Sequence, residues 1–220
     1  MNASSLIDQL LKTGLAAVQG ARERGDLDKY AKGAAAGGVL ALLLGTRSGR
    51  RLGGSALKVG SMAALGLLAW KTYNDWKGQQ QATPPVAAAG APMAAPPALP
   101  APQAEAHGRV LLKAMIAAAR SDGHLDERER DLVEAELKRS DADPALRQWV
   151  EAEMRRPVEP ADVAAGATTP ELAAEVYLAS LLVADETSTL ERAYLDALAR
   201  ELRLDDGLKA QLEASARATA

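Results

Sequence analysis

The chain has 220 residues, of which 48% are hydrophobic and only 3% aromatic, and its formal net charge is −3. It contains no Cys, no Phe and only two His. The lack of Cys excludes disulfides, thiolate catalysis and Cys-type zinc sites, and two His do not favour a His-rich zinc site or a Ser/His/Asp hydrolase. We therefore expect no enzyme, and a core built from Ala, Leu and Val.

A stretch rich in Pro and Ala, residues 79–106, divides the chain into two parts of opposite charge. Residues 1–106 contain 11 Lys and Arg against 6 Asp and Glu, whereas residues 107–220 contain 15 against 23. Seven of the eleven prolines lie in the divider, and such a composition favours an extended tether without a core. We predict a membrane-associated region 1–78, a disordered linker and one globular domain 107–220.

Residues 1 to about 30 show the three-to-four spacing of an amphipathic helix. Its apolar positions are Leu6, Leu10, Leu11, Leu15, Ala16 and Val18. A basic start, an apolar run and a small-residue cleavage site do not follow one another as in a secretory signal. We therefore expect an amphipathic helix here rather than a signal peptide.

Two glycine-rich apolar segments follow, Gly33–Gly45 and Leu52–Trp70, with a basic stretch at residues 47–51 between them. Because a helix needs about 20 mostly apolar residues to span a bilayer, the first segment is too short by itself. The second is nearly long enough, although Lys58 lies within it and must reach the interface or a partner. The pattern leaves open a single span, a shallow hairpin or an interfacial location, and it does not fix the orientation.

Small residues recur in these segments, and those four apart lie on one side of a helix, where they permit close helix packing in lipid. They are Gly33, Gly37, Gly45, Gly49, Gly53, Ser61 and Gly66. The residues Trp70, Lys71, Tyr73, Trp76 and Lys77 resemble the aromatic and basic belt of a membrane interface. We expect lipid contact through residues 33–77, and a protein partner or self-association through the glycine-rich helices. The alternatives are a soluble oligomeric hairpin and a partly disordered arm.

The C-terminal part shows helical periodicity throughout and no useful strand pattern, so we predict an all-α domain. Its seven expected helices span about 107–121, 126–139, 144–155, 160–166, 170–184, 188–203 and 206–218. Asp143 before Pro144, and Thr169 before Pro170, each provide a capping side chain ahead of a proline at the first helical position. The helices over 170–184 and 188–203 have wide apolar faces and are the expected core pair.

An internal repeat places two acidic turns in this domain. Residues 115–137 and 178–204 both run as an apolar helix, a short acidic turn and a new helix opened by a capping residue followed three positions later by Glu. The pairs are Asp126 with Glu129 and Ser188 with Glu191.

Three parts of the sequence carry a resemblance to a known family. They are ARSDGHLDERE (119–129), LLVADETSTLERAYLDALAREL (181–202) and the glycine-rich run GGVLALLLGTRSGRRLGGSALKVGSMAALGLLAW (37–70). The chain resembles the YebE-type family of uncharacterised bacterial inner-membrane proteins with a TerB-like domain. The resemblance implies a seven-helix TerB-like fold, a membrane-associated N-terminal region, the bacterial inner membrane as location and no known enzymatic activity. TerB relatives are associated with tellurite resistance and envelope stress, and metal binding has been proposed for their acidic residues.

The two acidic turns have two interpretations. In the first, they converge on a hard cation such as Ca²⁺ or Mg²⁺, which prefers oxygen ligands. The candidate ligands are Asp122, Asp126, Glu129, Asp185, Glu186 and Glu191. In the second, Asp126 and Ser188 only cap helices, Gly123 ends one, and the acidic side chains complement helix dipoles. The first turn lacks the spacing of an EF-hand, and we expect His124 to be an exposed turn residue.

Nucleic-acid binding is not expected, because the folded domain is acidic and offers no stacking platform. The sequence therefore predicts a membrane-associated, non-enzymatic binding or adaptor protein, related to envelope or metal stress. The alternative is a soluble, oligomeric, ion-binding stress protein that uses the acidic turns.

Overall fold

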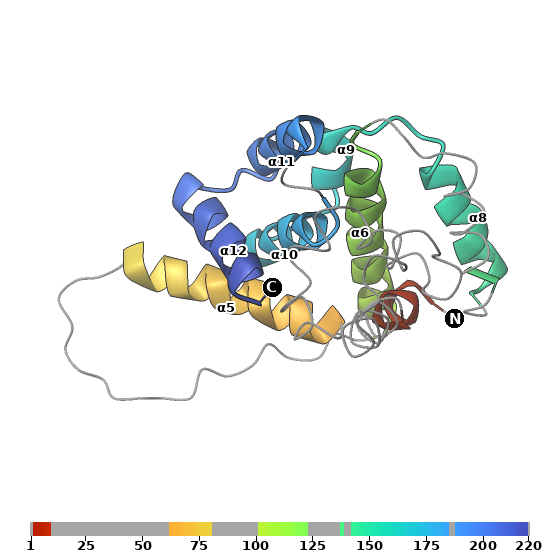
Figure 1. Ribbon diagram of the computed structural model, residues 1–220. Helices are drawn as coiled ribbons and strands as arrows, with labels where there is room; N and C mark the ends of the chain where they lie inside the picture. Colours follow the sequence, from red (N-terminus) through yellow and green to blue (C-terminus); the bar gives the residue numbers. More distant parts are fainter. Residues whose placement is uncertain are drawn as a thin grey trace, which may run out of the picture.

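The computed structural model describes residues 2–9, 62–80, 101–122, 137–138, 142–184 and 188–219. All regular secondary structure within these residues is helical, which confirms the prediction of an all-α protein (Figure 1). A short helix covers residues 3–9. The others are α5 (Met62–Gln80), α6 (Ala101–Ala119), α8 (Pro144–Glu153), α9 (Pro160–Ala164), α10 (Pro170–Leu181), α11 (Thr189–Glu201) and α12 (Asp206–Thr219).

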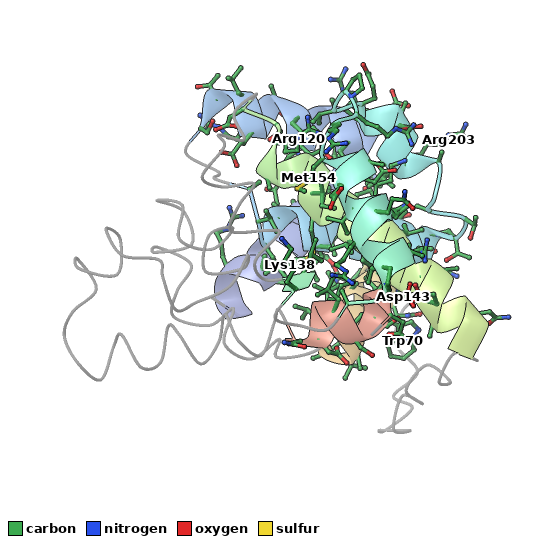
Figure 2. All side chains as sticks on the ribbon, turned by 90° about the vertical axis from the view of Figure 1, so that its right-hand side faces the viewer. Trp70, Arg120, Lys138, Asp143, Met154 and Arg203 are labelled. Atoms are coloured by element: carbon green, nitrogen blue, oxygen red, sulfur yellow. The ribbon has the colours of Figure 1, made fainter. Side chains whose placement is uncertain are left out.

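Helices α8 and α10 of the C-terminal part begin where the sequence predicts them. The Asp143 side chain accepts a hydrogen bond from Ala145 N at 2.8 Å, ahead of Pro144 at the start of α8 (Figure 2). In the same way, Thr169 Oγ1 accepts from Leu172 N at 3.2 Å at the start of α10. Both caps satisfy a backbone N–H that has no partner within the helix. The predicted helix 126–139 lies outside the described residues except for 137–138, which are helical.

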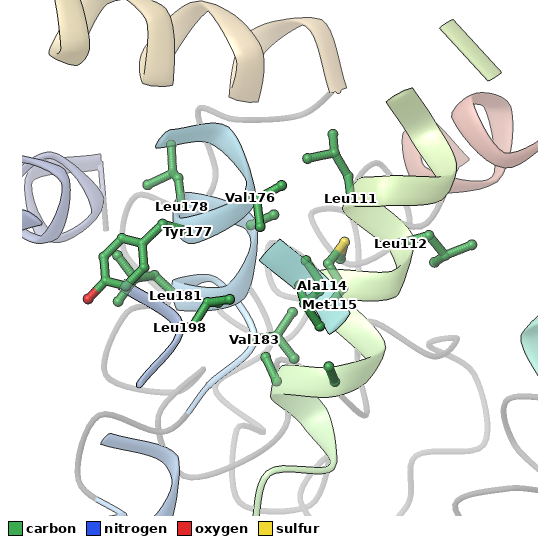
Figure 3. Packing of buried hydrophobic residues seen from close by; sticks show 14 of the residues in the cluster. Leu111, Leu112, Ala114, Met115, Val176, Tyr177, Leu178, Leu181, Val183 and Leu198 are labelled. Atoms are coloured by element: carbon green, nitrogen blue, oxygen red, sulfur yellow. The ribbon is translucent and has the colours of Figure 1, made fainter. Parts of the chain in front are cut away.

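Helix α10 is the centre of the core. Residues 173–181 are all buried, because the sequence AAEVYLASL presents mainly apolar or small side chains on every side of the helix. The helix packs most extensively against α5 and α6, and less against α12 and α11. Figure 3 shows Val176 and Tyr177 of α10 in the same buried cluster as Leu111 and Met115 of α6. The predicted pairing of α10 with α11 is therefore not the main contact of the core. Helix α11 packs mainly against α9.

Helix α5 belongs to this core, although the sequence assigned its first half to a membrane segment. Leu65 and Ala69 are buried, and the helix packs along α10 and α12. Two residues of the predicted membrane belt have the same role, since Tyr73 is 9% exposed and Trp76 packs against the core. A helix face of small and apolar side chains can pack in a protein core or contact a bilayer. In this structure α5 packs in the core, because α10 and α12 present apolar faces to it.

The helix at residues 3–9 also contributes to the core. Ala3, Leu6 and Ile7 are at most 1% exposed and lie in the same cluster as α10. Figure 1 shows this helix beside the first turns of α6. The described parts of the predicted regions 1–78 and 107–220 thus share one hydrophobic core, which does not fit two parts joined only by an extended tether.

The predicted linker 79–106 is too long at both ends. Residues 79–80 close α5 and residues 101–106 open α6. Pro102 is compatible with this, since a proline in the first helical turn removes only an N–H that has no partner within the helix. Residues 81–100 lie outside the described part of the chain.

Among the helices that the structure describes, none combines the length and the apolar character that a membrane crossing requires. The predicted segment Gly33–Gly45 and the first ten residues of Leu52–Trp70 lie outside the described residues.

Candidate functional site

The second acidic turn leads into α11 through a helix cap. Ser188 Oγ accepts a hydrogen bond from Glu191 N at 3.4 Å, as expected for the cap-x-x-Glu pattern. The Glu191 side chain is 8% exposed in the first turn of α11, where its negative charge complements the helix dipole. Helix capping therefore explains the position of the Ser188 side chain and the hydrogen bond that the Glu191 N–H donates.

The first acidic turn follows α6. Asp122 is half-buried in this turn, and Ser121 Oγ donates to the Ala118 carbonyl at 2.8 Å, which tightens the end of the helix. Helices α6 and α11 are in contact, so the helices next to Asp122 and Glu191 belong to one packed group. The convergence of the two turns themselves stays a prediction, because residues 123–136 and 185–187 lie outside the described part of the chain.

The other four candidate ligands, Asp126, Glu129, Asp185 and Glu186, lie outside the described residues, as does His124. Within the residues that are described, no group of three or more His, Asp and Glu side chains could hold a metal ion. The six-residue cation site therefore stays a prediction.

A small pocket lies between α6 and α9. Its volume is about 20 Å³, and Lys113, Arg120, Glu153 and Asp162 contribute to its lining. A volume of this size holds about one water, whereas small-molecule sites measure roughly 300–1,000 Å³. This pocket is therefore no candidate for a substrate.

The charged groups around this pocket connect three helices. Lys113 Nζ donates to Asp162 Oδ2 at 3.1 Å, and Arg156 donates to the same oxygen at 2.9 Å. The hydrogen bond and charge of Lys113, followed by the charge of Arg156, lower the pKa of the Asp162 carboxyl. Arg120 donates to the carbonyls of Glu153 and Arg156, where Figure 2 shows it near Met154 at the end of α8. These bonds have a structural role.

A pair of a half-buried His and a buried Glu is a feature that the sequence analysis did not predict. His107 Nε2 of α6 lies 2.8 Å from Glu175 Oε2 of α10, with side-chain exposures of 19% and 7%. Gly66 of α5 packs directly against this pair. A Cβ atom at this position would lie 3.0 Å from Glu175 Oε1. Gly66 therefore allows close approach of a carboxylate, and not the helix packing in lipid that its spacing suggested. One feature of the sequence points to this pair: Glu175 lies within an otherwise apolar helix, and a buried Glu usually has a partner.

Beside this pair, hydrogen bonds to α6 and α5 hold the helix at residues 3–9 in place. At its start, Ala3 N donates to Glu105 Oε2 at 2.8 Å and Ser4 Oγ donates to the Ala104 carbonyl at 2.6 Å. At its other end, Asp8 Oδ1 accepts from Met62 N at 2.7 Å and so caps α5 from a distant part of the chain. Residues that flank the segment 10–61 on its two sides are therefore in direct contact.

Glu105 also connects this helix to α8. Its second carboxylate oxygen accepts from Arg109 Nε at 3.0 Å, and the Arg109 guanidinium lies 5.6 Å from the centre of the Trp149 ring. This distance is within the range of a cation–π interaction. Helices α6 and α8 and the N-terminal helix thus meet at one partly exposed carboxylate.

Comparison with known proteins gives a family but no established biochemistry. The family described as "Protein of unknown function (DUF533)" matches residues 29–216. A protein of Yersinia enterocolitica described as "Uncharacterized protein in ampR 5'region" is 28% identical over 103 residues, which are 47% of this chain and 74% of that protein. No solved structure matches.

Proposed function

Because the chain belongs to the DUF533 family, a TerB-like family, we propose that it is a membrane-associated binding protein without enzymatic activity. The folded helices form the part that binds a partner, and residues between the N-terminal helix and α5 contact lipid. We propose the bacterial inner membrane as its location and envelope or metal stress as its context.

The hydrogen bond between Asp8 and Met62 carries this proposal. It joins the end of one core helix to the start of another, so the 52 residues of segment 10–61 leave and re-enter the folded part at one place. This bond favours an arrangement in which the two ends of the segment lie on the same side of a membrane. It supports a hairpin or an interfacial location over the single crossing that the sequence pattern leaves open.

The sequence of segment 10–61 favours an interfacial location over a double crossing. The apolar stretches outside α5 are residues 33–45 and 52–61, which as helices would measure roughly 20 and 15 Å against a hydrocarbon thickness of about 30 Å. A hairpin would place Arg47, Arg50 and Arg51 within the bilayer, at about 2.5–3.5 kcal/mol for each Arg at its centre. At the interface the same side chains can contact anionic headgroups.

Vesicle flotation tests the proposal. We expect the full chain to float with vesicles of phosphatidylethanolamine and phosphatidylglycerol, and an alkaline carbonate wash to release it. A variant in which Gly and Ser replace residues 31–60 at equal length should stay in solution. The same replacement of residues 83–99 is the control and should still float. The proposal is wrong if the full chain does not float, or if the first variant floats equally well.

A second candidate function is divalent-cation binding by a soluble, oligomeric stress protein, and the position of Glu191 favours it. Glu191 lies in the first turn of α11, next to the second acidic turn, and α11 contacts α6, which leads into the first acidic turn at Asp122. Calorimetry of the full chain with Ca²⁺ and Mg²⁺, compared with the Asp122→Asn, Glu191→Gln double variant, tests this function. Equal heats from the two proteins would exclude both residues as ligands.

A further inference from the structure

The helix at residues 3–9, which we call the strap, depends on its docking site. In proteins, most of the stability of an amphipathic helix comes from the packing of its apolar face rather than from intrinsic helix propensity. Its apolar residues Ala3, Leu6 and Ile7 are at most 1% exposed, so the strap's apolar face is fully occupied by the core. The strap is therefore stable as a helix only while it is docked or bound elsewhere.

The strap immediately precedes segment 10–61 in the sequence and contacts the first residue after it. Asp8 caps Met62, the first residue of α5, and the segment begins and ends beside this bond. Gly66 lies one turn further along α5, against the buried Glu175. On α6, a Cβ on Gly108 would meet Ser4 Oγ at 2.7 Å, so strap and α6 are in direct backbone contact next to His107. The strap, α5 and the His107–Glu175 pair are thus contiguous.

One apolar face of the strap has two possible partners. In the sequence, the positions of Leu6 and Ile7 continue at helical spacing into Leu10, Leu11 and Leu15. An amphipathic helix at a membrane surface directs this face into the bilayer. The same face cannot contact the core and the bilayer at once, so the two binding partners compete for it.

We propose that the strap is a releasable contact: it is docked on α6 in the free protein, and a lipid surface displaces it. This inference rests on the proposed function, because it requires that the N-terminal part meets a bilayer. Thermodynamic linkage then makes the coupling reciprocal, so weakening the docked strap strengthens membrane binding.

Spin labels on introduced cysteines measure the release, since the chain has no Cys of its own. Ser5 on the strap and Gln148 on α8 are exposed, so Ser5→Cys with Gln148→Cys reports the distance from strap to core in the full chain. We expect a narrow distance distribution in buffer and a longer, broader one with phosphatidylethanolamine–phosphatidylglycerol vesicles. Gln148→Cys with Ala210→Cys, both within the core helices, is the control and should not change.

A second measurement tests the linkage. Asp8→Ala removes the cap that holds the strap to α5, and we expect it to tighten vesicle binding by about three- to tenfold. Asp75→Ala removes an equal charge from an exposed position on α5 and should have a much smaller effect.

The outcomes separate the inference from the function on which it rests. Flotation of the labelled chain with an unchanged strap distance overturns the inference and leaves the proposed function intact. Equal effects of Asp8→Ala and Asp75→Ala, or a broad strap distance already in buffer, also overturn the inference. Failure of the chain to float overturns the proposed function and the inference together.

Discussion

At the scale of single residues, two buried tyrosines differ in how their hydroxyl groups are satisfied. Tyr177 donates to Glu213 Oε1 at 2.9 Å. Within the described residues the Tyr194 hydroxyl has no hydrogen-bond partner, and burial raises its pKa. The hydroxyl of Ser180 donates to the Val176 carbonyl at 3.0 Å instead. A hydroxyl that is buried without a partner lowers stability.

The two tyrosines give a matched pair of variants. We expect Tyr194→Phe to leave the free energy of unfolding unchanged or raise it by about 1 kcal/mol, because it removes an unsatisfied polar group. Tyr177→Phe should lower it by about 1 kcal/mol, because a hydrogen bond is lost. Urea unfolding of the full chain measures both changes. A loss of stability in Tyr194→Phe would show that its hydroxyl has a partner after all.

Gly66 and Gly78 of α5 allow the effect of a close side-chain contact on stability to be distinguished from the effect of helix propensity. Gly78 has no atom near the position of an added Cβ, so Gly78→Ala should stabilise the protein by up to about 1 kcal/mol. Gly66→Ala brings the same gain but also a contact of 3.0 Å with a carboxylate that His107 holds in place. We expect Gly66→Ala to be less stable than Gly78→Ala by about 1–3 kcal/mol in urea unfolding. Equal stabilities would mean that Glu175 moves aside freely.

At the scale of the elements, helix starts follow the sequence more closely than helix ends. Asp143, Thr169 and Ser188 each cap the expected helix. The end of α11 instead involves Arg203, whose φ is 54°. The Leu204 N–H reaches back to the Ala199 carbonyl at 3.0 Å, as in a helix stop that usually contains Gly. A left-handed conformation at an Arg was not detectable from the sequence.

Replacement of Arg203 by Gly should therefore stabilise the protein by about 1 kcal/mol, because Gly adopts positive φ without a steric penalty. The control is Arg200→Gly, within α11, which should destabilise by about 1 kcal/mol. Thermal unfolding followed by circular dichroism compares the two variants. A lower melting temperature for Arg203→Gly would contradict the role of this residue as the helix stop.

At the scale of the whole molecule, the described N-terminal helices are part of the fold. Leu6, Ile7, Leu65 and Ala69 are buried in one cluster with α10. We expect the fragment 107–220 to lack a cooperative urea transition, because it exposes the faces of α10 and α12 that α5 covers. The variant with Gly and Ser at residues 31–60 keeps these helices and should unfold like the full chain. A fragment as stable as the full chain would instead support two independent halves.

The candidate site was only partly accessible to sequence reasoning. The cap-x-x-Glu pattern located Ser188 and Glu191 correctly, because capping depends on residues that are close in the sequence. The pair of His107 and Glu175 joins residues 68 positions apart, and the bond of Asp8 with Met62 spans 54 positions. Such contacts depend on how the helices pack, and no local pattern indicates them.

The sequence by itself determined the all-α class, the start points of α8, α10 and α11, and the family resemblance, because periodicity and capping are local properties. The tertiary structure decided where α5 belongs. Its small and apolar residues match both a bilayer and a helix face, and only the presence of α10 and α12 beside it distinguishes the two. The same packing brings Asp8 and Met62 together, because these residues meet only when both helices are docked on one core.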